Sequence, residues 1–244
     1  LYFNAIYSDI NSNTTIENNI IDGFNYMSIW LYGGTNTQPG VTGALVAHNY
    51  VKNCEDYSSI YLQNVAGAVR YNKVENGARA IQIQPYGNAT SGQVHDNEFQ
   101  GFITGIYYNY ARREAAKWSI YDNTITAALP PSSAGPSSWS FDGAWQGISL
   151  RTFATEGPSG TPEVEFYGNT IDGSGASSSN SFWTAVRGVE IINAKGKADF
   201  YNNNIVGTES AIYTHDNSDI SNMLFTENSR SEEHTSELQS RQST

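Results

Sequence analysis

The sequence predicts an all-β fold in which short parallel strands stack coil upon coil into a single solenoid, and three observations lead to this prediction. A pattern of an apolar residue, two variable residues, Asn, one variable residue and a second apolar residue recurs along the chain. A second pattern, small-apolar-variable-apolar, alternates strictly with it. Charged residues are only 15% of the chain while Gly, Asn, Ser and Thr abound, which is typical of turn-rich β proteins.

The first pattern has an Asn in every copy. Its copies span residues 16–21, 46–51, 69–74, 94–99, 120–125, 166–171 and 200–205, with a final half at 225–228. We interpret each copy as a short strand with a corner at the Asn, because Asn tolerates left-handed backbone conformations. Asn amides that stack from coil to coil are also expected to hydrogen-bond as a ladder.

The second pattern is a short strand with period-two alternation, too short and too rich in β-branched residues for a helix. Its copies span residues 5–8, 28–31, 59–62, 80–83, 105–108, 147–150, 188–191 and 211–214. A lone strand of this length cannot bury its apolar face, whereas stacked coils bury a continuous apolar column and pair every backbone group. Alternation of the two patterns predicts about eight coils. Hairpins of a β-sandwich would leave the long repeat unexplained.

With these two patterns, residues 1–229 resemble the right-handed parallel β-helix family, to which pectate-lyase-like proteins belong. The resemblance implies a single-stranded, right-handed coil, and a substrate-binding face on one of its sheets. It identifies an architecture and not an activity.

Both ends of the sequence are expected to be truncated. Leu1 is not an initiator Met, and a secretory leader is expected upstream. Residues 230–240 resemble the in-frame translation of a common sequencing-library adapter. We therefore divide the chain into a β-helix domain, 1–229, and a non-native or disordered tail, 230–244.

Alternation within the second pattern sends every other side chain outward, so that outward residues form two columns from coil to coil. Aromatic rings there can stack on sugars while amides meet hydroxyls, and Gly-, Ser- and Pro-rich insertions are expected to border the face. The competing interpretation is a structural ladder of cross-strand aromatic pairs. The candidate substrate-binding residues are Tyr7, Trp30, Tyr32, Tyr61, Gln63, Gln82, Gln84, Tyr107, Asn109 and Tyr213.

A catalytic pair of carboxylates is excluded on this face. Asp9 and Glu190 lie six coils apart, about 29 Å at the usual strand spacing, whereas glycosidases need about 5–9.5 Å. A lyase needs a base and a cation or metal that neutralises the substrate carboxylate. Arg151, Glu190 and His215 fall on three successive coils and are the candidate catalytic residues. Ordinary exposed polar residues are the competing interpretation.

The resemblance to pectate lyases has two further implications. Arg acts as the base in some of them, and Arg151 lies on the corresponding kind of face. The Asp cluster that holds their calcium is missing here, which puts metal dependence in doubt. No metal site or cofactor is predicted, and calcium stays open only through the resemblance, without a ligand cluster in the sequence.

Composition narrows the possible partners. A net charge of −11 argues against nucleic acid, and no apolar run is long enough to insert into a membrane. Two classes of function stay open for what we expect to be a monomer. One is a polysaccharide-binding protein, a lyase rather than a hydrolase if it is an enzyme. The other is a non-catalytic adhesin-type solenoid. Both imply an extracellular, cell-surface or periplasmic location.

Overall fold

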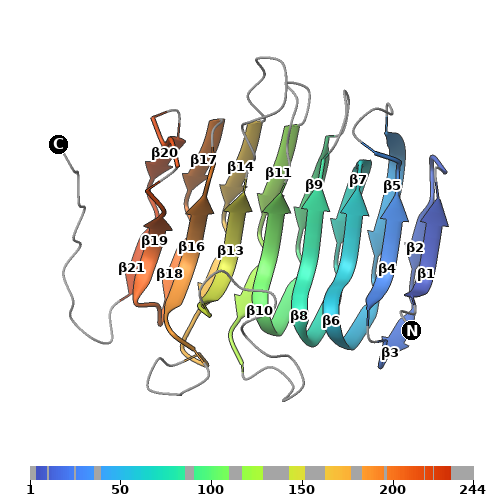
Figure 1. Cartoon of the computed structure of the whole chain (residues 1–244), viewed down its shortest axis with the longest axis horizontal. Helices are drawn as coiled ribbons and strands as arrows, with labels where there is room; N and C mark the ends of the chain where they lie inside the picture. Colours follow the sequence, from blue (N-terminus) through green and yellow to red (C-terminus); the bar gives the residue numbers. More distant parts are fainter. Residues whose placement is uncertain are drawn as a thin grey trace.

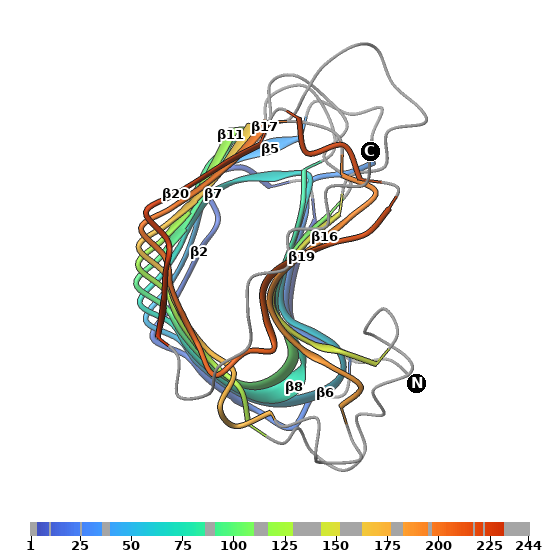
Figure 2. The same cartoon turned by 90° about the vertical axis from the view of Figure 1, so that its left-hand side faces the viewer.

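A computed structural model shows a solenoid of parallel strands that winds from the N-terminus to the C-terminus (Figure 1). The structure describes residues 4–9, 11–24, 26–35, 40–85, 91–109, 117–128, 143–151, 163–176, 183–194, 197–216, 218–221 and 223–231. Every strand pairing in it is parallel, and like segments stack above like segments (Figure 2). The predicted parallel β-helix is therefore confirmed.

An 8-stranded sheet contains the strands that precede each corner, and its order follows the chain. Its strands are β2 (Thr15–Glu17), β5 (Val41–Ala47), β7 (Val65–Arg70), β9 (Gly92–His95), β11 (Lys117–Tyr121), β14 (Glu163–Tyr167), β17 (Lys197–Tyr201) and β20 (Met223–Thr226).

The second sheet is 13-stranded and contains the strands that follow each corner. In β6, β8 and β10 the two predicted strand segments of a coil run together, whereas later coils divide them, as in β12 and β13. The strands are β1 (Asn4–Asp9), β3 (Ile20–Asp22), β4 (Met27–Tyr32), β6 (Tyr50–Gln63), β8 (Lys73–Gln84), β10 (Glu98–Asn109), β12 (Thr124–Thr126), β13 (Trp145–Arg151), β15 (Thr170–Asp172), β16 (Val186–Ile192), β18 (Asn204–Val206), β19 (Ser210–Thr214) and β21 (Ser229–Ser231). Strand β21 extends two residues past the expected domain boundary.

The core is made of apolar columns that run along the solenoid. Phe166, Phe200 and Phe225 stack with ring centroids 4.7 and 5.1 Å apart. The small first residue of the second pattern has a packing reason: a Cβ on Gly147 would lie 2.4 Å from Cγ2 of Ile171. That distance is shorter than any van der Waals contact, so a larger residue would displace the column.

The corner differs from the prediction in one respect. The first pattern is not one strand, because β9 ends at His95 and β10 begins at Glu98, with Asn97 in the bend between them. The pattern's two apolar residues therefore belong to different sheets. Both still point into the core, since the bend turns the chain around it.

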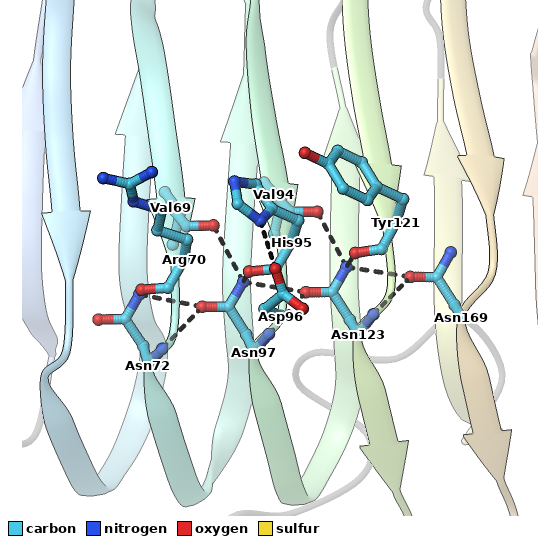
Figure 3. A network of polar contacts seen from close by, with 10 residues as sticks. All are labelled: Val69, Arg70, Asn72, Val94, His95, Asp96, Asn97, Tyr121, Asn123 and Asn169. Atoms are coloured by element: carbon cyan, nitrogen blue, oxygen red, sulfur yellow. Dashed lines mark hydrogen bonds and ion pairs between the residues drawn. The ribbon is translucent and has the colours of Figure 1, made fainter.

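The predicted Asn ladder is confirmed, and Figure 3 shows its central part. Each ladder Asn except the last donates from its backbone N–H and its Nδ2 to Oδ1 of the Asn in the next coil, at 3.0–3.2 Å and 2.8–3.0 Å. The second Nδ2 hydrogen is used too: Asn97 donates to the Val69 carbonyl. The ladder residues are Asn19, Asn49, Asn72, Asn97, Asn123, Asn169, Asn203 and Asn228.

The predicted reason for Asn at the corner was wrong. The left-handed residue is the one before each ladder Asn, with φ between 53° and 64°. These residues are Asn18, His48, Tyr71, Asp96, Asp122, Gly168, Asn202 and Glu227. Their side chains are diverse because the position is set by backbone geometry, whereas Asn recurs because its amide has both the donors and the acceptor that the ladder needs.

Tyrosines with raised pKa values are expected to make the protein less stable at alkaline pH. Burial raises the pKa of Tyr108 in the core, and of Tyr121, Tyr167 and Tyr201, which stack outside. A raised folded pKa means that the unfolded chain loses its protons first, so stability is intact below the ordinary value of 10.0 and falls above it. We expect Tyr108→Phe to lessen this loss in melts monitored by circular dichroism. The exposed Tyr71→Phe is the control, and identical pH profiles for wild type and Tyr108→Phe would contradict the prediction.

Candidate functional site

The outward residues of the second pattern line up as predicted. Strand register pairs Tyr7 with Trp30 and continues, residue by residue, to Tyr213. This first column reads Tyr7, Trp30, Tyr61, Gln82, Tyr107, Ser149, Glu190 and Tyr213. The second column includes Asp9, Tyr32, Gln63 and Gln84, then Asn109, Arg151 and Ile192, with His215 beyond. We call these two columns the column face.

The column face is more buried than expected. Tyr7 and Tyr213, at its two ends, are 48% and 37% exposed. Between them Tyr61, Gln82, Tyr107, Ser149 and Glu190 are all 5% exposed or less. The side chains of these middle coils are covered, because they lie against each other and against a further row of polar residues. In Figure 2 the sheet bends inward at β16 and β19, so its outward side is concave there.

Aromatic rings dominate the first coils of the column face. Trp30 lies between Tyr7 and Tyr61, with ring centroids 4.8 and 6.1 Å away, and Tyr32 contacts it edge-on at 5.7 Å. Burial and the Asp9 carboxylate raise the pKa of Tyr7. We call Tyr7, Asp9, Trp30, Tyr32, Tyr61 and Gln63 the aromatic half.

Sequence reasoning missed a third row of polar residues. It lies just before the small residue of the second pattern and reads Ser58, Arg79, Thr104, Gln146 and Arg187 by register. These side chains reach the first column, as Ser58 and Arg79 do when both donate to Oε1 of Gln82 at 3.0 and 2.9 Å. The signal was present, because this position is polar in five successive coils.

Glu190 is the centre of a charged cluster that contains all three candidate catalytic residues. Its carboxylate is fully buried and accepts hydrogen bonds from Arg187 and Gln146. His215 Nε2 lies 3.1 Å from Oε1, and Arg151 Nη2 lies 4.0 Å from Oε2. A carboxylate can only accept, so Nε2 of His215 is the donor. The structure thus brings together Arg151, Glu190 and His215 and adds Arg187.

Guanidinium groups of this region stack on tyrosines of neighbouring coils. Arg79 and Arg151 lie 4.1 and 5.2 Å from the ring centroid of Tyr107, and Arg187 lies 3.9 Å from that of Tyr213. Burial lowers the pKa of Arg79, and the charge of Arg151 adds to this effect. Among the described residues of the column face and the row beside it, these three arginines outnumber the one carboxylate of these coils, Glu190, in a protein whose net charge is −11.

Two polar atoms beside these arginines lack a hydrogen-bond partner within the part of the chain that the structure describes. They are Oγ of Ser149, which is fully buried, and Oδ1 of Asn109, which is 3% exposed. Asn109 pairs with Arg151 in register, and Ser149 lies two residues from it along β13. We call Arg79, Gln82, Gln84, Tyr107, Asn109, Ser149, Arg151, Arg187, Glu190, Tyr213 and His215 the arginine half.

The insertions expected to border the column face fall largely outside the described residues. In the described ranges no group of His, Cys, Asp and Glu side chains is arranged to hold a metal ion. Nor does that part of the chain contain a helix long and apolar enough to cross a membrane.

No protein-family model matches this chain, and no curated protein matches its sequence. The fold and the two halves of the column face are therefore the basis for any statement about function.

Proposed function

We propose that the column face binds an extended polysaccharide along the solenoid axis, as an extracellular, cell-surface or periplasmic carbohydrate-active protein. The observation that carries the proposal is the register itself, which places aromatic rings, amides and guanidiniums in continuous columns over successive coils. Strands spaced about 4.8 Å apart make such a face suited to a polymer rather than to a small metabolite.

The charged cluster supports β-elimination rather than hydrolysis. In this step a base removes the proton from the carbon beside a uronate carboxylate, a double bond forms, and the adjacent glycosidic bond breaks as its oxygen leaves and takes up a proton. His215 and Arg151 are partly exposed, with 14% and 16% of their side chains accessible. We assign proton removal to Nδ1 of His215, because Nε2 already holds the proton donated to Glu190, and carboxylate neutralisation to Arg151. Glu190 is fully buried, so its role is to position these two groups.

The test is binding and turnover on purified acidic and neutral polysaccharides, with unsaturated uronates followed by their ultraviolet absorbance. His215→Ala should abolish product while retaining affinity. Arg151→Ala should weaken binding of acidic glycans about tenfold or more, as expected for a charge-assisted hydrogen bond. Arg70→Ala, an arginine on the 8-stranded sheet, is the matched control. Binding without product would remove the lyase, and no binding to any glycan would remove the whole proposal.

One observation favours the alternative of a non-catalytic adhesin-type solenoid. Side chains in the middle of the column face are buried and hydrogen-bond to each other, as Tyr61 does to Gln84 and Thr104 to Gln146. Such a closed network stabilises the coils without any ligand. The absence of binding in the same assay would leave this alternative standing.

A further inference from the structure

The two halves of the column face differ in charge. None of the outward residues of the aromatic half carries a positive charge, and its ionised side chain is the carboxylate of Asp9, which is exposed. The arginine half begins with Arg79, in the coil after Tyr61, and its described side chains include three guanidiniums and one carboxylate, that of Glu190. Counted over the described side chains, the face is therefore neutral to negative at one end and positive at the other.

A polymer with a carboxylate on every sugar does not fit this distribution. Its charges would lie over the aromatic half, where Asp9 repels them and the rings of Tyr7 and Trp30 cannot replace the water that they lose. Neutral sugars fit that half, because their apolar faces pack on aromatic rings while hydroxyls meet amides such as Gln63.

The arginine half fits an acidic sugar. Guanidiniums recognise carboxylates through charge-assisted hydrogen bonds, which gain strength where water is excluded. An independent observation points to a ligand at the same place: Oγ of Ser149 and Oδ1 of Asn109 are buried there without a hydrogen bond in the described structure. Buried polar atoms usually have a partner, and a carboxylate or hydroxyl of a sugar can be one for each.

We propose that the ligand is a mixed glycan, with neutral sugars on the aromatic half and an acidic sugar on the arginine half, beside Tyr107, Ser149 and Arg151. This inference rests on the proposed function and adds the substrate class and its direction along the solenoid. The acidic sugar then lies next to the charged cluster around Glu190.

Calorimetry with the full chain and four oligosaccharides of equal length tests the inference. The first probe contains only neutral sugars and the second only uronates. The third, the mixed probe, has neutral sugars at one end and uronates at the other. The fourth is the mixed probe with its carboxylates reduced to alcohols. We expect the mixed probe to bind at least about tenfold more tightly than each of the others. If no probe binds, the proposed function itself is wrong. If the all-uronate, neutral or reduced probe equals the mixed one, the proposed function stands and the mixed-glycan inference is wrong.

Variants test which end of the mixed probe binds to each half of the column face. Tyr7→Ala should weaken the neutral and mixed probes about tenfold, whereas Arg151→Gln should weaken the mixed probe and leave the neutral one unchanged. Tyr71→Ala is matched to Tyr7→Ala, because the two rings are 47% and 48% exposed on different faces. Equal losses from Tyr71→Ala and Tyr7→Ala, or loss of neutral binding in Arg151→Gln, would overturn the assignment. The reduced probe tests the same point on the unmodified protein.

Discussion

Replacing Asn97 by Ala is expected to lower the free energy of unfolding by about 3–5 kcal/mol. Asn97 is 2% exposed and bonds in both directions along the ladder. Its Oδ1 accepts from N and Nδ2 of Asn72, and its Nδ2 donates to Val69 and Asn123. The substitution leaves several of these buried groups unsatisfied, at about 1–3 kcal/mol each.

Urea unfolding followed by circular dichroism measures this effect. The matched control is Asn19→Ala at the first rung, where Asn19 donates to Asn49 but the residue is only half-buried. Its loss should be about 1 kcal/mol, the usual net contribution of one hydrogen bond. Equal values for the two variants would show that the interior of the ladder adds nothing beyond a surface hydrogen bond.

Glu190→Ala is expected to destabilise the protein by about 3–5 kcal/mol, because it removes a fully buried carboxylate that pairs with Arg187 and Arg151. Arg187 and His215 bond directly to Glu190, and Arg151 lies within ion-pair distance. Since Gln146 also donates to it, the substitution removes an acceptor from three side chains and an ion-pair partner from Arg151.

The comparison with Glu190→Gln separates charge from shape, since Gln keeps one oxygen acceptor and the volume of the side chain. We expect a smaller loss for Gln than for Ala in thermal melts. Glu98→Ala is the surface control, because Glu98 is 54% exposed and pairs with Lys73 at 3.6 Å; such pairs contribute about 0–1 kcal/mol. A Glu190→Ala protein as stable as Glu98→Ala would show that the buried cluster is dispensable for folding.

Much of the fold could be predicted because its determinants are local and repeated. Period-two alternation decides which side chain of Ile60-Tyr61-Leu62 faces the core, and the recurrence of Asn decides which residues stack. The same register explains why Arg151 and Glu190 lie on adjacent strands, in the second and first columns, and why Tyr213, two residues before His215, lies beside Glu190. Whether these residues act on a glycan stays a prediction.

Burial of the column face could not be predicted in the same way. Exposure depends on how long side chains fold over their own strand, as Arg79 does to reach Gln82 and Arg187 to reach Glu190. The sequence analysis considered only the residues within the second pattern and not the position just before it. Likewise, the left-handed residue before each ladder Asn has no fixed side chain, so nothing in the composition of Tyr71 or Glu227 indicates it.

The ladder uses the same Asn–Asn hydrogen bonds in every coil, and this affects how the chain between its residues can change in length. Successive ladder Asn residues are separated by as few as 23 and as many as 46 positions, yet the distance from backbone N to the next Oδ1 stays at 3.0 and 3.1 Å. Each rung requires only an identical rung above it, so whole turns can be duplicated, deleted or lengthened between rungs without leaving a mismatched amide. The scaffold is thereby modular, and segments between rungs are free to diverge while the repeat that supports them does not.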